Sequence, residues 1–113
     1  MKILFTTKGE SSLAMMDPRF GRADFMLIYD EEAKEFKPLV NEAKEDAHGA
    51  GLKAATLAIS SGAKVVITGN GAGDKASEIL KKGGVEVYVG AGQMKVKEAY
   101  EAYKTGQLEK QEL

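Results

Sequence analysis

The chain has 113 residues, of which 43% are hydrophobic and 29% charged, and its formal net charge is -1. This size suits one soluble globular domain, and the absence of a basic surplus argues against a nucleic-acid partner. Cysteine is absent, which excludes disulfides, thiolate nucleophiles and cysteine-ligated clusters. No apolar run approaches the ~20 residues of a membrane span, so we expect no membrane contact and a cytoplasmic location.

The first part of the chain predicts three strands and one long loop. Residues 2–6 are apolar, with β-branched and aromatic members, and predict a central strand. Residues 7–24 show no sustained period, and a connection this long inside a compact domain is usually functional or mobile. Residues 25–30 and 35–40 predict an antiparallel hairpin, whose second strand lies at the sheet edge because Pro38 lacks a backbone donor.

The rest of the chain predicts alternating helices and strands. The ranges are helix 52–61, strand 65–67, helix 74–83, strand 85–89 and helix 93–104. Such alternation implies parallel strands joined by right-handed crossovers. We therefore predict an α/β fold with a single domain over residues 1–106, in which helices cover both faces of a mixed five-stranded sheet to give three layers. The polar tail, residues 107–113, is expected to fray.

Four loops should meet at one edge of this sheet. If the first, fourth and fifth strands are parallel, their carboxyl ends share an edge, which is where open α/β sheets bind ligands. Glycine loops that lead into helices leave backbone N–H groups unpaired, and the helix dipole favours negative charge, so the expected ligand is an anion. The alternative is that each glycine only makes a tight turn or a helix stop. The four loops are 7–24, 48–51, 69–73 and 90–92.

The candidate site residues come from these loops. Arg19 and Arg22 could add charge-assisted donors, although a structural ion-pair cluster with Asp17 is an equal alternative. His48 is the only histidine and the candidate metal ligand, although a solvated or structural histidine is the common alternative. The remaining candidates for binding are Gly49, Gly51, Asn70, Gly71 and Gly73. No catalytic residue is predicted, because the chain offers no cysteine and no nucleophile in a typical catalytic context, so we do not expect an enzyme.

Three motifs occur together in this chain. They are DPRFGRA at residues 17–23, HGAG at residues 48–51 before a predicted helix, and VVITGN at residues 65–70 before a glycine turn. In combination they resemble the dinitrogenase iron–molybdenum cofactor biosynthesis family, over about residues 1–105. The resemblance implies a ribonuclease-H-like topology and noncovalent binding of an anionic iron–molybdenum, other molybdenum or iron–sulfur cluster near the glycine loops. It also implies a histidine as a metal ligand, which here could only be His48.

The leading hypothesis is a non-enzymatic binding or carrier protein for such a cluster. Cofactor-biosynthesis or cluster-acceptor proteins would be its partners. Clusters of this kind are anionic and already contain sulfide, so a carrier needs hydrogen-bond donors and an imidazole rather than cysteines. Two alternatives remain open: a binder or sensor of a phosphorylated metabolite or nucleotide, and a protein-interaction module whose loops contact a larger partner.

Overall fold

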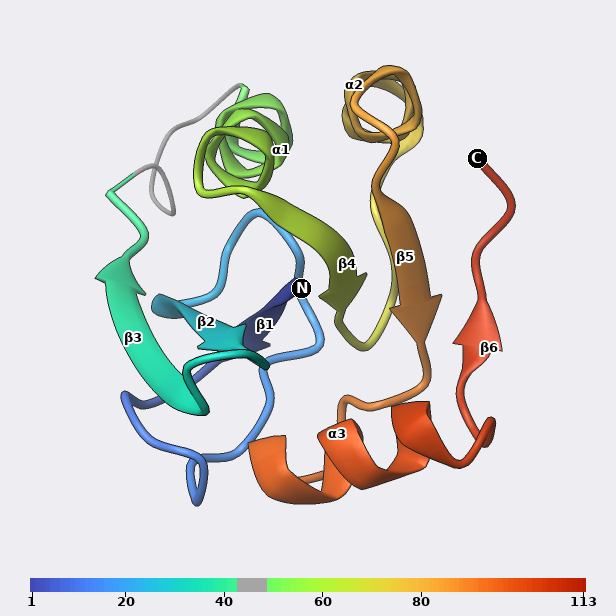
Figure 1. The fold of residues 1–113 in the computed structure, drawn as a ribbon. Helices are drawn as coiled ribbons and strands as arrows, with labels where there is room; N and C mark the ends of the chain where they lie inside the picture. Colours follow the sequence, from blue (N-terminus) through green and yellow to red (C-terminus); the bar gives the residue numbers. More distant parts are fainter. Residues whose placement is uncertain (43–48) are drawn as a thin grey trace.

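Strand β1 (Lys2–Thr7) lies inside the sheet, with other strands on both of its sides (Figure 1). The computed structural model describes residues 1–42 and 49–113. Side chains of a strand alternate between the two faces of a sheet, so Leu4 contributes to one core cluster while Ile3 and Phe5 contribute to the other. All three are fully buried, as expected for a strand covered on both faces.

The strand order is β3-β2-β1-β4-β5-β6. β2 (Phe25–Asp30) and β3 (Glu35–Val40) form the antiparallel hairpin beside β1. On the other side, β4 (Ala63–Ile67) and β5 (Glu86–Val89) continue the sheet in parallel. The predicted hairpin, the central position of the first strand and the edge position of the strand that contains Pro38 are all confirmed.

The sixth strand, β6 (Glu109–Lys110), was not predicted. It pairs antiparallel with β5, so the expected five-stranded sheet is wrong by one strand. The expectation that residues 107–113 fray is also wrong, because Leu108 is buried and the Gln111 N–H donates to the Val87 carbonyl at 2.8 Å. Two exposed, charged residues give no hydrophobic signal for a strand, and this one forms because β5 offers an unpaired edge. The ribonuclease-H-like classification of the topology stays a prediction.

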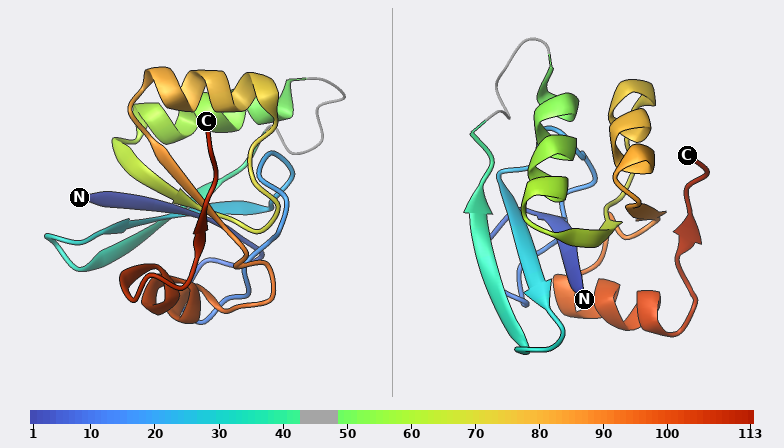
Figure 2. Two further views of the ribbon diagram at one scale, coloured as in Figure 1. Left: turned by 90° about the vertical axis from the view of Figure 1, so that its right-hand side faces the viewer. Right: turned by 45° about the horizontal axis from the view of Figure 1, so that its top comes forward.

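Helices cover both faces of the sheet, as the predicted three layers require. α1 and α2 lie side by side on one face, and α3 covers the other (Figure 2). Their bounds are α1 (Ala50–Ser60), α2 (Asp74–Lys82) and α3 (Val96–Lys104). α1 begins two positions earlier than predicted and α3 begins three later. Within the described ranges, no helix is long and apolar enough to cross a membrane.

The loops after β1, β4 and β5 meet at one edge of the sheet, which we call the glycine edge; it also includes residues 49–51. The Asn70 N–H donates to the Pro18 carbonyl at 2.8 Å, and the Gly90 N–H donates to the Gly69 carbonyl at 3.0 Å. A Cβ atom on Gly69 would lie only 2.5 Å from the Pro18 Cα and 3.1 Å from the Gly92 Cα. Close approach of these backbones therefore requires glycine at position 69.

Replacing Gly69 by alanine should therefore destabilise the fold. We expect Gly69→Ala to lower the free energy of unfolding by about 1–3 kcal/mol, the usual cost of overpacking a dense site. Gly51→Ala is the matched control at the same edge, since its Cβ would lie 3.7 Å from the Ala76 Cβ, an ordinary contact, and alanine favours a helix. Urea denaturation should show equal or higher stability for this control. An unchanged Gly69→Ala protein would contradict the described packing of these loops.

Candidate functional site

A hollow of about 440 Å³ opens between the N-termini of α1 and α2. It is lined by Gly49, Gly51, Leu52, Gly73, Asp74, Lys75 and Ala76. Both helices begin at the glycine edge because α1 runs back along the sheet before β4, and α2 starts just after β4 ends. We call this space the α1–α2 hollow. It contains three of the residues predicted from sequence.

Neither helix has a side-chain cap among the described residues. Gly49, with φ 81°, is the N-cap of α1, and Gly73, with φ -71° and ψ 174°, is the N-cap of α2. The first helical bonds run from the Lys53 N–H to the Gly49 carbonyl and from the Ser77 N–H to the Gly73 carbonyl. The amides of residues 50–52 and 74–76 precede these bonds and have no intrahelical partner. Two sets of backbone donors thus open on one hollow.

The side-chain charge at the α1–α2 hollow is mixed. Lys75 and Asp74 are neighbours in the first turn of α2, and both are exposed. Their opposite charges offset one another, and exposure to water weakens each. The preference of the hollow for an anion therefore comes mainly from the backbone amides and from the positive ends of two helix dipoles.

Arg19 is held in place by Asp17. The guanidinium donates from Nε to Oδ1 at 3.0 Å and from Nη2 to Oδ2 at 2.8 Å, and the Arg19 backbone N–H donates to Oδ1 at 3.0 Å. The Asp17 side chain is 1% exposed, whereas that of Arg19 is 57% exposed. The hydrogen bond from Arg19 holds the pKa of Asp17 below its ordinary value, although burial acts in the opposite direction. The structural ion pair exists, and it leaves Arg19 accessible from solvent.

The contact between the arginine-containing loop and α1 was not predicted. A Cβ atom on Gly21 would lie 2.8 Å from the Gly51 nitrogen, so these two backbones touch. Arg22 follows directly and is half-buried. Gly21, the glycine of the DPRFGRA motif, is the one sequence signal for this contact, because a glycine inside a loop can mark a close approach of two backbones. The loop after β1 thereby reaches the first turn of α1.

The other predicted site residues lie outside the hollow. Asn70 is exposed and its N–H is used to hold Pro18. Gly71 has φ 90°, and a Cβ atom there would lie 2.7 Å from the Gln111 side-chain oxygen. His48, the predicted metal ligand, falls outside the described residues. Among residues 1–42 and 49–113, no group of three or more acidic or histidine side chains could hold a metal ion.

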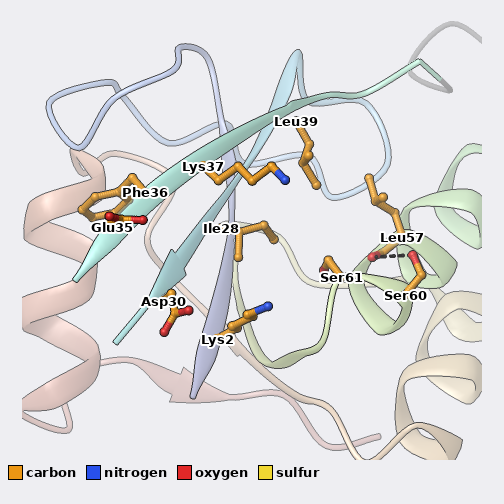
Figure 3. Close-up of a pocket in the computed structure, with 10 residues that line it drawn as sticks. All are labelled: Lys2, Ile28, Asp30, Glu35, Phe36, Lys37, Leu39, Leu57, Ser60 and Ser61. Carbon is orange, nitrogen blue, oxygen red and sulfur yellow. Dashed lines mark hydrogen bonds between the residues drawn. The ribbon is translucent and has the colours of Figure 1, made fainter. Parts of the chain in front are cut away.

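A second pocket, of about 550 Å³, lies at the other end of α1 (Figure 3). Lys2 and Lys37 extend from their strands toward the end of this helix, near Ser61. The last turn of α1 contains no basic residue, so these lysines complement the negative end of its dipole. Asp30 at the end of β2 and Glu35 at the start of β3 also line the pocket, so its mixed charge favours neither anions nor cations. None of the predicted site residues belongs to it.

The family model described as dinitrogenase iron-molybdenum cofactor matches residues 1–106 of the chain. The chain belongs to this family. The resemblance predicted from the three sequence motifs is therefore confirmed. The residues matched by the model of the dinitrogenase iron-molybdenum cofactor family include strands β1 to β5, all three helices and the whole glycine edge, and end before β6.

Three proteins with 32–35% sequence identity to this chain resemble it, one by its sequence and two by their solved structures. An uncharacterized protein of Methanocaldococcus jannaschii is 32% identical over 98 residues, which are 84% of this chain and 81% of that protein. The apo form of the orange protein from Desulfovibrio gigas superimposes with a TM-score of 0.90 at 32% identity, over 97% of this chain and 92% of that one. The NMR structure of a NifB-like protein from Thermotoga superimposes with a TM-score of 0.82 at 35% identity, over 96% of this chain and 91% of that one.

The Asp17–Arg19 pair should stabilise the glycine edge. Arg19→Gln leaves a buried carboxylate with one backbone donor, so we expect a loss of about 1–3 kcal/mol in the free energy of unfolding at pH 7. Lys8→Gln is the control. Lys8 affects the pKa of Asp17 only through its charge, and its effect is the smallest of those that act on this carboxyl group. It should change stability little.

The same pair predicts a pH dependence. Because folding lowers the pKa of Asp17, its stabilising contribution is complete above the unfolded pKa and is lost as the pH falls through the folded pKa. In Arg19→Gln the folded pKa of Asp17 is no longer held down, so the variant loses less stability than the wild type on acidification. Urea denaturation should therefore show a difference between the two proteins that is largest at pH 7 and shrinks as the pH falls to 2. Identical pH profiles for the two proteins would contradict this role of Arg19.

Proposed function

We propose that this protein is a non-enzymatic carrier of an anionic metal–sulfur cluster, containing molybdenum or iron, which binds at the α1–α2 hollow. One observation carries the proposal: two neighbouring helices begin at glycines without side-chain caps, and their first turns line the same hollow. Free amides and two dipole ends together form a site for negative charge. A bound anion would complete the hydrogen bonding of both helix ends.

The donor set suits a cluster that arrives already assembled. With no cysteine in the sequence, the protein has no thiolate for building or ligating an iron–sulfur cluster. Backbone amides can instead donate to the sulfides of a preformed cluster, and glycine at positions 49, 51 and 73 lets a bulky anion approach the main chain. Binding would be noncovalent apart from any histidine ligand, which suits a carrier that releases its cargo.

The predicted side chains take different roles in this proposal. His48 precedes the N-cap Gly49 by one peptide bond and is the proposed metal ligand, since imidazole is a good ligand for several transition metals. Arg19 and Arg22 would balance the cluster charge from the loop after β1. Asn70 and Gly71 would maintain the shape of the neighbouring loop. The proposed partners are cofactor-biosynthesis or cluster-acceptor proteins in the cytoplasm.

The family supports this reading at a coarser level. Its description connects the domain with the iron-molybdenum cofactor of dinitrogenase, and the orange protein, whose fold this chain shares, was solved in an apo form. The same backbone N–H groups could also donate to the oxygens of a phosphate group, so a phosphorylated metabolite or a nucleotide is the competing ligand. Competition experiments can separate the two.

Anaerobic titration with tetrathiomolybdate, followed by absorbance, tests the proposal. We expect saturable binding that His48→Ala weakens, and that excess inorganic phosphate or ATP does not displace. Displacement by either competitor at similar concentrations would favour the phosphate reading instead. Absence of binding by the wild type would contradict the carrier proposal for this class of anion.

The role of the free amides is tested by giving α2 a cap of its own. Gly73 has negative φ and open space at its Cβ, so Gly73→Asp can be accommodated. Its carboxylate should accept from the first-turn amides, changing stability by only a few tenths of a kcal/mol while repelling the anion. Gly73→Ala, which adds a methyl group without an acceptor, should bind like the wild type. Equal binding by Gly73→Asp and Gly73→Ala would contradict the amide site.

A further inference from the structure

The C-terminal segment, residues 107–113, runs from the α3 layer across the edge of the sheet toward α2 (Figure 2). At its start, Leu108 is buried in the core cluster beneath α3. At its end, Leu113 packs against the core cluster on the opposite face. Between them β6 pairs with β5. The segment is thus anchored on both faces of the sheet, and we call it the C-terminal strap.

Gln111 attaches the strap to the loop between β4 and α2. Its Oε1 accepts from the Ala72 N–H at 2.9 Å, and its Nε2 donates to the Ala72 carbonyl at 2.8 Å. The Gln111 backbone N–H donates to the Val87 carbonyl at 2.8 Å, which fixes the position of the side chain relative to the sheet. One side-chain amide therefore satisfies both backbone groups of Ala72.

Ala72 lies directly before the N-cap of α2. It is buried, and it stands between Gly71 and the N-cap Gly73, two positions at which the chain has wide conformational freedom. Gly71, at φ 90°, brings its own backbone so close to Gln111 that a Cβ would clash with the side-chain oxygen. Fixing Ala72 removes the freedom that the flanking glycines would otherwise give to the first turn of α2.

We propose that Gln111 is a positioning residue, which holds the 69–73 loop so that the first amides of α2 face the α1–α2 hollow. The consequence for binding rests on the proposed function, in which these amides receive the anion. The strap lies beyond residue 106, where the match to the family model ends.

Gln111→Leu tests the positioning role, because it keeps a side chain of similar size and removes both hydrogen bonds to Ala72. Without any ligand, amide NMR should show changed shifts and faster hydrogen exchange at residues 71–75, and unchanged signals at residues 50–52 of α1. Lys110→Ala is the matched control at the neighbouring position of the strap, since it removes only an exposed ion pair with Glu86. It should leave both groups of amides unchanged. Unchanged signals at residues 71–75 in Gln111→Leu would overturn the proposal.

The binding consequence is measured separately with tetrathiomolybdate. Gln111→Leu should weaken binding by about 10-fold or more, as loss of supporting hydrogen bonds does at metal sites, while Lys110→Ala binds like the wild type. Wild-type affinity in a Gln111→Leu protein with shifted amides would overturn the link between loop position and binding. If the wild type itself does not bind, the proposed function fails, and the ligand-free amide signals alone decide the positioning role.

Discussion

The direction of β4 determines where the candidate site can form. α1 precedes β4 and α2 follows it, and both helices run antiparallel to it on the same face of the sheet. Their N-termini must therefore lie together at the carboxyl end of β4. Parallel pairing of β1 and β5 with β4 brings two further loops to the same place. A helix–strand–helix order with both helices on one face of the sheet thus places two positive dipole ends beside each other.

Close approach of backbones at this edge explains why its chemistry is mainly that of the main chain. Gly69 touches Pro18, and Gly21 touches Gly51, at distances that leave no room for a side chain at positions 69 and 21. Glycine N-caps leave the helix amides open, where serine or aspartate would have satisfied them. The Asp17–Arg19 pair supplies a fixed, exposed positive group beside this surface. The donors at the α1–α2 hollow are therefore mainly the first backbone amides of two helices.

The sequence predicted the features that depend on local patterns. Apolar runs located the five main strands, Pro38 indicated an edge strand, and the glycine loops indicated the edge at which α1 and α2 begin. The start of α1 was placed too late because Gly51 has poor helix propensity and the N-cap Gly49 has no side chain that would signal a helix start. The close contact with α1 requires glycine at position 21, in the loop after β1, and not at position 51.

The features that sequence reasoning missed depend on contacts between distant residues. β6 and Gln111 interact with segments about 20 and 40 positions away, and nothing in a polar tail indicates such partners. The proximity of Gly71 to the Gln111 side chain and its positive φ were not predicted either, and its contact with a ligand stays a prediction. Lys75 and Asp74 were not selected because their position at a shared hollow depends on how α1 and α2 pack.

The central claim is that backbone amides at two helix N-termini bind one anion together. The most direct test is an amide NMR titration of the wild-type protein with tetrathiomolybdate under anaerobic conditions. The account predicts that the signals of residues 50–52 and 74–76 shift together, with one common affinity, while those around the pocket at the other end of α1 stay fixed. Shifts confined to one helix, or centred on Lys2 and Lys37, would contradict it.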